Sequence, residues 1–393
     1  MSRMELLNLC ELIVDCPHST AQDEGEGFPL ISTPNIGKGR LLLDGVHRVS
    51  KQVYDDRNKR AIPQEDDLIF AREATPGNVA IIKKEKVCLG QRTVLIRPNK
   101  LVIDSSFLMY YMLSPKIQHD LLKTANGSTV NHVNMSQIRK LKIKSLPKLE
   151  MQKQISHILE AYDLKIENNN KRIKILEQMA EELYKEWFVR CRFPEYKDYK
   201  FKHEKPKGWV LGTHNDMKIP QDWSFGKVEN IGNFSRGKNI TKEQMIEGNV
   251  PVISAGIEPS GYHNASNVKG MSLTMSASGA NAGYLKYNLE DIWAADCSYY
   301  QDDSNIWFMY HSLNFIRKAI DNLQVGSAQP HVYPKNINKL CIMVPEEKYI
   351  KKFNELVSPV YLEIKRLQEK NKNLEKQRDL LLPRLMSGKL EVK

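Results

Sequence analysis

The sequence predicts an α+β fold in which two mixed α/β domains are separated by an antiparallel coiled coil of two long helices, with a pseudo-two-fold internal repeat. The segment GSTVNHVNMSQIRKLKIKSLP (residues 127–147) returns as GSAQPHVYPKNINKLCIMVP (326–345), with eight identities in a window of 17 residues. Ordinary residue usage supplies about one. A long heptad pattern follows each copy. A period of about 200 residues is too long for a solenoid unit and indicates a doubled domain.

The heptad patterns predict long helices over residues 148–190 and 345–393. Each pattern runs for five heptads without a glycine, which is typical of a coiled coil. Two copies related by a two-fold axis perpendicular to the seam pair in antiparallel fashion, and this geometry places the other domains at opposite ends of a rod. The seam residues that we expect are Ile155, Leu159, Tyr162, Ile166, Ile173, Leu176, Leu183, Phe353, Val357, Val360, Ile364, Leu367, Leu374 and Leu381.

Three polar or helix-breaking residues interrupt these patterns. Asn169 and Asn371 fall in the seam, where a polar residue fixes the register of pairing; the alternative is that each reaches solvent. Pro359 lies near the start of the second helix and predicts a kink or a late beginning there.

The remaining residues form two globular modules, module 1 (residues 1–147) and module 2 (191–344, which begins with a charged linker). Runs such as DDLIFAREA (66–74) and SLTMSAS (272–278) predict strands. Segments Phe107–Ala125 and Asn305–Leu323 predict helices that lead into the repeated motif. Ahead of that motif the modules share almost no identities. A duplicated frame with divergent contents favours two modules that do the same job on different targets.

Charge and cysteine usage narrow the class of protein. The net charge is +11, and most of the basic excess lies outside the long helices. Lysine and arginine displace the counterions of phosphates, so this excess favours nucleic-acid binding. The six cysteines show neither CxxC pairs nor metal-ligand spacing, which predicts no zinc site and no disulfide framework. No apolar run is long enough for a signal peptide or a membrane span, so we expect a soluble, cytoplasmic protein.

Four features of the sequence are found together: the two-module organisation, the GSTVNHV and GSAQPHV turns, the ELYKEWFVRCRFP end of the first long helix and the RDLLLPRLMSGKL end of the second. In these features the chain resembles the DNA specificity subunit of type I restriction-modification systems. The resemblance implies that residues 1–147 and 191–344 are target recognition domains and that the long helices space them. Its implied partners are double-stranded DNA, two methylation subunits and, through the complex, restriction subunits of a bacterial or archaeal defence system. It also implies a bipartite, asymmetric site with one half-site for each module.

The sequence predicts no catalytic residue and no cofactor site in this chain. A glycine loop for a cofactor and an Asn/Asp-Pro-Pro-aromatic stretch are both absent, and SRGKNIT (235–241) is only a fragment of a phosphate-binding loop. The resemblance assigns S-adenosylmethionine, ATP and Mg²⁺ to the partner subunits, which methylate adenine and cut DNA. The alternative from another class is a non-catalytic coiled-coil adaptor that binds protein or carbohydrate.

Two further sets of residues are predicted to make contacts. Loop residues carry most base and phosphate contacts in such domains, and the DNA-binding candidates are Lys38, Arg40, Arg72, Asn78, Thr129, His132, Arg236, Lys238, Ser278, Asn281, Gln329, His331 and Tyr333. Apolar residues outside the seam complete larger helix bundles, and the candidates for docking partner helices are Ile175, Met179, Tyr184, Phe188, Leu380 and Leu382. For the second set, packing on the chain's own modules is the alternative.

Overall fold

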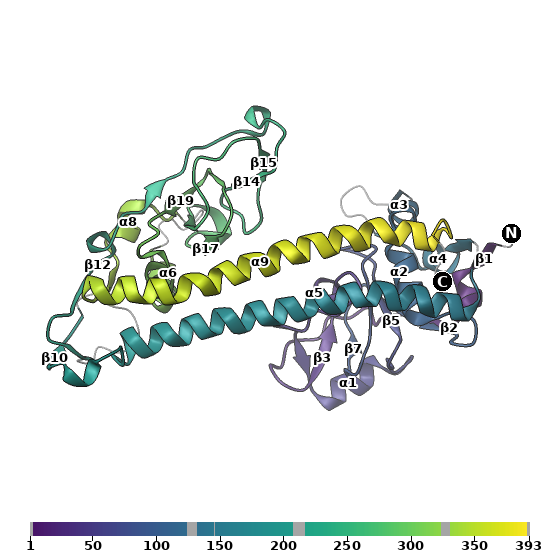
Figure 1. Cartoon of the computed structure of the whole chain (residues 1–393). Helices are drawn as coiled ribbons and strands as arrows, with labels where there is room; N and C mark the ends of the chain where they lie inside the picture. Colours follow the sequence, from purple (N-terminus) through teal and green to yellow (C-terminus); the bar gives the residue numbers. More distant parts are fainter. Residues whose placement is uncertain (1–2, 124–131, 145, 207–216, 324–330, 391–393) are drawn as a thin grey trace. The chain divides into compact units, whose positions relative to one another are not determined.

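The computed structural model describes residues 3–123, 132–144, 146–206, 217–323 and 331–390. The chain divides into two compact units. Unit 1 contains Met1–Glu167 and Asn371–Lys393, and therefore includes module 1; unit 2 contains Asn168–Lys370 and includes module 2. Each unit also holds a stretch of both long helices, α5 (Leu149–Tyr184) and α9 (Glu347–Met386) (Figure 1).

Unit 1 is built on a four-stranded antiparallel sheet in the order β2-β8-β5-β6. A three-stranded sheet in the order β4-β3-β7 lies in the same unit, and β1 pairs with β9. Its strands are β1 (Arg3–Glu5), β2 (Cys10–Asp15), β3 (Phe28–Ile31), β4 (Arg48–Val49), β5 (Leu68–Ala71), β6 (Val79–Ile81), β7 (Cys88–Leu89), β8 (Thr93–Pro98) and β9 (Lys142–Lys144). Its short helices are α1 (Lys51–Arg57), α2 (Ser105–Leu113), α3 (Pro115–Lys123) and α4 (Met135–Arg139).

Unit 2 repeats this topology. Its four-stranded sheet has the order β13-β19-β16-β17, its three-stranded sheet the order β15-β14-β18, and β12 pairs with β20. The bounds are β10 (Phe201–Glu204), β11 (Met217–Pro220), β12 (Ser224–Lys227), β13 (Ser235–Arg236), β14 (Val250–Ile253), β15 (Gly261–His263), β16 (Ser272–Ser276), β17 (Leu285–Asn288), β18 (Trp293–Ala294), β19 (Cys297–Tyr300) and β20 (Cys341–Val344). The helices are α6 (Ile306–Phe315), α7 (Arg317–Asp321) and α8 (Pro334–Asn338).

Helices are present in both segments where they were expected, 107–125 and 305–323, but each is divided in two; residues 124 and 125 lie outside the described residues. In module 1 the break falls between α2 and α3, at Pro115, which has no N–H to donate to the preceding turn. In module 2 the break falls at Ile316 without a proline. The segment expected to be a linker contains the β10–β11 hairpin, and its Phe193 and Trp223 stack within the core of unit 2 with ring centroids 4.6 Å apart.

The long helices pair in antiparallel fashion within each unit. In unit 2, Arg172 Nη2 lies 3.1 Å from Glu363 Oε1, whereas the rings of Tyr184 and Phe353 lie 6.1 Å apart. Residue numbers on α9 therefore fall as those on α5 rise. In unit 1 the same core holds Ile155 and Leu159 of α5 together with Leu382 and Leu385 of α9.

None of the fourteen expected seam residues is exposed. The buried ones are Ile155, Leu159, Ile166, Phe353, Val357, Ile364 and Leu367, and the others are half-buried. Asn169 and Asn371 are also buried, so the alternative in which each reaches solvent is wrong. The late beginning considered at Pro359 is wrong as well, because α9 begins at Glu347.

Candidate nucleic-acid interface

Two loops that were predicted from separate parts of module 1 lie side by side. Asn78 Nδ2 donates to the carbonyl of Ile36 at 2.9 Å, and Gly39 N donates to the carbonyl of Val79 at 2.8 Å. The loop NIGKGR (residues 35–40), which contains Lys38 and Arg40, is thereby fastened to the turn TPGN (75–78), which contains Asn78. Lys38 and Arg40, which flank Gly39, are both exposed. Asn78 itself holds the two loops together, so its side chain is engaged within the module.

The repeated His-Val motif joins the same region of module 1. Val133 N donates to the carbonyl of Arg72 at 3.0 Å, and Arg72 Nε donates to the carbonyl of Val133 at 3.0 Å. Arg72 Nη1 lies 3.0 Å from both carboxylate oxygens of Asp15. The Arg72 side chain is therefore committed to the frame of its own module. His132 Nε2 lies 3.1 Å from Asn134 Oδ1, and Asn134 is the N-cap residue of α4.

Module 2 brings its predicted segments together in the same way. Ser278 forms an isolated antiparallel bridge with His331, and Gly237 N donates to the carbonyl of Cys297 at 2.9 Å. Arg236 donates through Nη2 to Asp296, whose other carboxylate oxygen accepts from Ser278 Oγ at 2.5 Å.

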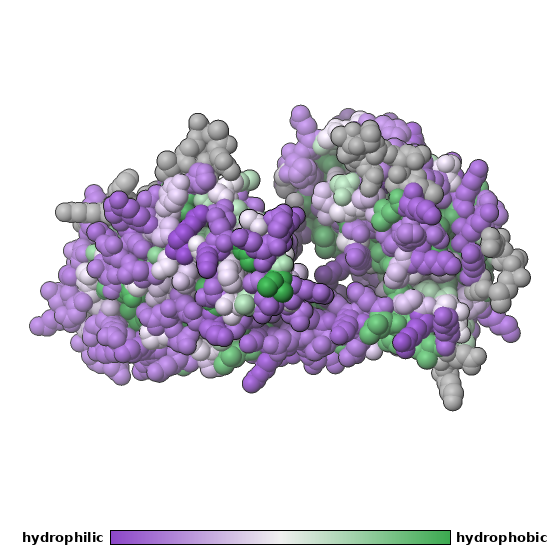
Figure 2. Space-filling view, turned by 90° about the horizontal axis from the view of Figure 1, so that it is seen from above, coloured by the Kyte–Doolittle hydropathy of each residue, from purple (hydrophilic) through white to green (hydrophobic). Residues whose placement is uncertain are grey.

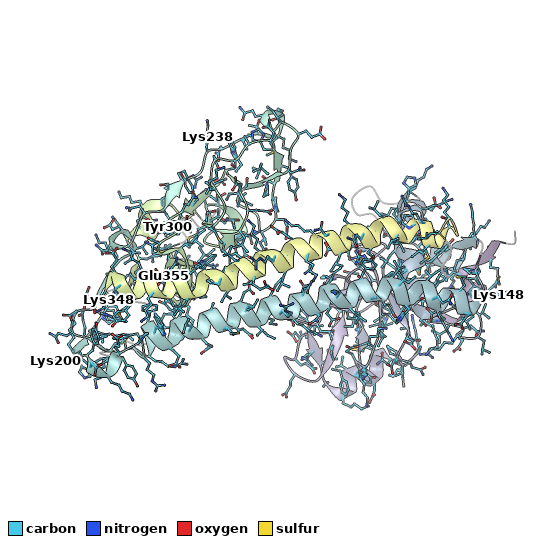
Figure 3. All side chains as sticks on the ribbon, in the orientation of Figure 1. Lys148, Lys200, Lys238, Tyr300, Lys348 and Glu355 are labelled. Atoms are coloured by element: carbon cyan, nitrogen blue, oxygen red, sulfur yellow. The ribbon has the colours of Figure 1, made fainter. Side chains whose placement is uncertain are left out.

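The loops of module 2 carry exposed basic and aromatic side chains. Lys238 is exposed, and Figure 3 shows it on the part of the module remote from α9. Tyr333 is 48% exposed and stacks on His331, with planes 11° apart, which offers an aromatic face at the surface. Asn281 closes its turn by accepting from Tyr284 N at 2.9 Å. Thr129 and Gln329 lie outside the described residues.

Sequence reasoning missed the acidic members of both clusters. Asp15, Glu73 and Asp296, together with Arg92, lie beside the predicted residues, and each forms an ion pair with one of their side chains or with a neighbour. Their partners are distant in the chain; Arg72, for example, is 57 residues from Asp15. No local pattern in the sequence could have joined them.

The predicted docking residues divide into two groups. Ile175, Met179 and Leu380 are 55%, 59% and 56% exposed. The face shown in Figure 2 is mostly hydrophilic, with small apolar areas scattered over it.

The other three predicted docking residues are buried in their own unit, where they pack on the chain itself. Tyr184 OH bonds with Ser312 Oγ at 3.1 Å, and the ring of Phe188 lies 4.9 Å from that of Phe308. Leu382 lies in the core of unit 1. For these three residues the structure supports the alternative reading, and an exposed docking surface does not include them.

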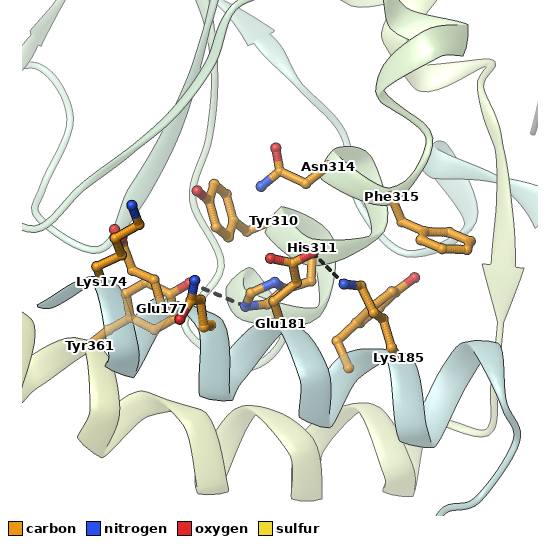
Figure 4. A pocket seen from close by; sticks show the side chains of 11 residues that line it. Lys174, Glu177, Glu181, Lys185, Tyr310, His311, Asn314, Phe315 and Tyr361 are labelled. Carbon is orange, nitrogen blue, oxygen red and sulfur yellow. Dashed lines mark hydrogen bonds and ion pairs between the residues drawn. The ribbon is translucent and has the colours of Figure 1, made fainter. Parts of the chain in front are cut away.

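A cavity of about 600 Å³ in unit 2 is lined by α5, α6 and α9 (Figure 4). At its wall His311 Nε2 lies 3.1 Å from Tyr361 OH, and burial, helped by the Lys185 ammonium, lowers the pKa of His311 to about 3. A histidine with so low a pKa is neutral at physiological pH. Tyr361 in turn stacks on Trp307 with ring centroids 3.5 Å apart. The histidine is thus part of an aromatic core.

In the described part of the chain, no group of three or more His, Cys, Asp or Glu residues is placed to hold a metal ion. Within those same residues, none of the helices combines the length and the apolar character needed to cross a membrane.

The model of the type I restriction modification DNA specificity domain matches residues 5–178 and again residues 220–376. The chain belongs to the type I restriction-modification DNA specificity family. The two matches of the family model fall on the two copies of the repeat that the sequence indicated. Specificity subunits of this family are non-catalytic, and they serve DNA sequence recognition.

Curated relatives of the specificity family cover nearly the whole chain. The type I restriction enzyme MjaIX specificity subunit of Methanocaldococcus jannaschii is 26% identical, over 94% of this chain and 88% of the relative. The putative MjaX specificity subunit of the same organism is also 26% identical, over 99% and 93%. The crystal structure of the S subunit of a type I system from M. genitalium shares the fold, with a TM-score of 0.57, 16% identity, and coverage of 98% and 95%.

Proposed function

We propose that this specificity subunit reads a bipartite, asymmetric DNA site, with one half-site for each module. The observation that carries the proposal is the pairing of one sheet topology with two different sets of loop side chains. A common frame positions both modules on the duplex in the same way, because contacts to phosphates fix register. Side chains that differ between the modules then select different bases, because base-edge contacts specify sequence.

The subunit docks two methylation subunits through its long helices, and restriction subunits join through that complex. Support comes from Ile175 and Met179, which lie one turn apart on α5 and are both exposed, and from Leu380 on α9. Exposed apolar side chains on paired helices are suited to completing a larger bundle. In this proposal S-adenosylmethionine, ATP and Mg²⁺ are used by the partner subunits, which methylate adenine and cleave DNA.

Selection from a duplex library with two randomised segments, separated by spacers of varied length, tests the proposal. We expect the full chain, with its methylation subunits, to enrich two short sequences that differ from each other and lie at one fixed separation. Affinity for the selected duplex should fall steeply with salt, because each neutralised phosphate releases counterions. Enrichment of one sequence, or of none, would contradict bipartite reading; salt-independent capture of a protein or glycan instead would support the adaptor alternative.

A further inference from the structure

The backbones of the two modules are hydrogen-bonded alike around the candidate interface. Val133 N donates to the carbonyl of Arg72 at 3.0 Å in module 1, and Val332 N donates to the carbonyl of Ala277 at 2.9 Å in module 2. Both valines belong to the repeated His-Val motif. Arg72 and Ala277 therefore occupy equivalent positions, although the sequences around them show no repeat.

A second pair of bonds extends the equivalence to the neighbouring strands. Cys16 N donates to the carbonyl of Thr93 at 3.2 Å, and Gly237 N donates to the carbonyl of Cys297 at 2.9 Å. These bonds lie at the same corner of the four-stranded sheets β2-β8-β5-β6 and β13-β19-β16-β17. The residues next to these hydrogen-bonded positions correspond as follows: Asp15 with Arg236, Glu73 with Ser278, and Arg92 with Asp296.

In module 1 the side chain at the end of β2 is an acceptor, Asp15, and the side chain directly before β8 is a donor, Arg92; the two belong to separate ion pairs. The carboxylate of Asp15, 19% exposed, is held by Arg72. Arg92 Nη1 lies 2.6 Å from Glu73 Oε2, and the arginine side chain is 59% exposed. Asp15 Oδ1 accepts from Cys16 N at 3.0 Å as well as from Arg72. Each carboxylate oxygen has two lone pairs, so Asp15 Oδ2 and Glu73 keep acceptor capacity beyond these bonds.

In module 2 the charges at these two positions are reversed, and the two side chains form one ion pair with each other. Arg236 lies at the end of β13, and its side chain is 40% exposed. Asp296 lies directly before β19, the neighbour of β13 in the sheet. Its side chain is 31% exposed, and Ser278 Oγ also donates to it. Two of the three equivalent positions therefore carry opposite charges, Asp15 against Arg236 and Arg92 against Asp296.

We propose that this ion-pair cluster is a specificity determinant, and that the exchange of donor and acceptor makes the two modules select different bases. The proposal rests on DNA reading as proposed above. In the major groove guanine offers the acceptors O6 and N7, whereas cytosine and adenine offer amino donors. Arg236 selects guanine in the half-site of module 2. At the corresponding place in module 1, Asp15 and Glu73 select an amino group of cytosine or adenine.

The ion pairs also orient the reading groups before DNA arrives. Long side chains lose rotamer freedom when they bind, and a partner that already fixes the side chain removes part of that loss. Asp296 bonds with both Arg236 and Ser278, so the guanidinium is held toward the loop face. This arrangement explains why acidic side chains lie on a surface that contacts a polyanion.

The test is an exchange of the two charges in module 2. A double variant, Arg236→Asp with Asp296→Arg, keeps an ion pair at the site, and Ser278 can accept from the new arginine because a hydroxyl both donates and accepts. Base preference is measured by selection from randomised duplexes with the full chain and its methylation subunits. We expect a changed preference at one or two base pairs of one half-site, with the other half-site unchanged and the melting temperature close to wild type.

A single variant covers the case in which the double exchange does not fold. Arg236→Gln removes the charge of a partly exposed side chain, and we expect it to reduce the preference for guanine about tenfold or more. The matched control exchanges another surface ion pair of module 2, Lys227→Glu with Glu229→Lys, whose Nζ–Oε1 distance is 2.9 Å. The control should leave base preference as it is.

The outcomes separate this inference from the proposed function. If folded Arg236→Gln and the double variant both retain the wild-type preference, or if the control changes it equally, the cluster is not a determinant, although DNA reading stands. If the wild-type protein enriches no sequence, the proposed function fails, and this inference fails with it.

Discussion

Asp163 of α5 and Arg378 of α9 form an ion pair within unit 1, with 2.5 Å between Oδ1 and Nη1. Tyr110 OH donates to the other carboxylate oxygen at 2.5 Å. Equivalent seam positions of the two long helices, such as Ile155 and Phe353, are 198 residues apart, so Asp163 corresponds to Tyr361 and Arg378 to Ala180. The same position of the duplicated unit is therefore polar in one copy and apolar in the other.

Asp163→Ala should destabilise the protein by about 1–3 kcal/mol, because it removes the acceptor of Arg378 Nη1 and of Tyr110 OH and leaves the partly buried guanidinium paired with the exposed Asp379. The double variant Asp163→Tyr with Arg378→Ala carries the residues found at these positions in unit 2. It should lose less unfolding free energy than Asp163→Ala. Chemical denaturation with urea measures both free energies of unfolding. Equal losses in the two variants would show that the ion pair does not matter to the pairing of the helices.

Phe353 is fully buried in unit 2, where its ring lies 5.3 Å from that of Phe188 and 6.1 Å from that of Tyr184. Phe353→Ala should cost about 3–5 kcal/mol, through lost burial and the cavity left behind. The matched control is Leu356→Ala on the same helix, at a side chain that is 51% exposed. It should change the free energy of unfolding by about 0.5 kcal/mol or less. Similar losses of unfolding free energy in both variants would show that Phe353 is not part of the core.

The long helices could be predicted from the sequence because heptad spacing is a local signal. Heptad counting, however, considers only a partner helix. It assigned Tyr184 to an exposed docking surface, whereas this side chain bonds with Ser312 of α6. Burial against a globular module depends on residues more than a hundred positions away, and these leave no periodic trace on the helix itself.

In the residues that precede the repeated motif, the two modules share a sheet topology that could not be predicted from the sequence. Strand order depends on pairing between residues far apart in the chain. Gly77 and Gly283 illustrate this. Both have positive φ, and the N–H of each donates back to the preceding strand, to Ala71 and Ser276 respectively. The turns around them share almost no other residue. The same ambiguity affected Arg72, since an arginine that binds DNA and one that binds Asp15 look alike in a sequence.

His311 should make stability depend on pH. Burial lowers its pKa from 6.5 to about 3 in the folded protein, so between these values the unfolded chain binds the additional proton. Stability contributed by the neutral histidine is therefore present above about pH 6.5 and is lost progressively as pH falls. At pH 5 the loss amounts to about 2 kcal/mol.

The pH dependence can be assigned to His311 by replacing it with a residue that does not titrate. His311→Gln should flatten the difference in free energy of unfolding between pH 8 and pH 5, although it lowers stability at both values. The check is urea denaturation at the two pH values, with exposed His203→Gln as the control. An unchanged slope in His311→Gln would assign the pH dependence to other groups.

Ile175 and Met179 provide the test of docking through the helices. Both project from α5 in unit 2, and both are more than half exposed, so Ile175→Glu with Met179→Glu should leave the melting temperature nearly unchanged. Binding of methylation subunits should weaken strongly, because charged groups are placed where apolar side chains would be desolvated. Gln178→Glu, on the same turn and exposed, is the control for added charge. Sedimentation of the mixed subunits measures assembly; full assembly by the double variant would place the docking surface elsewhere on the chain.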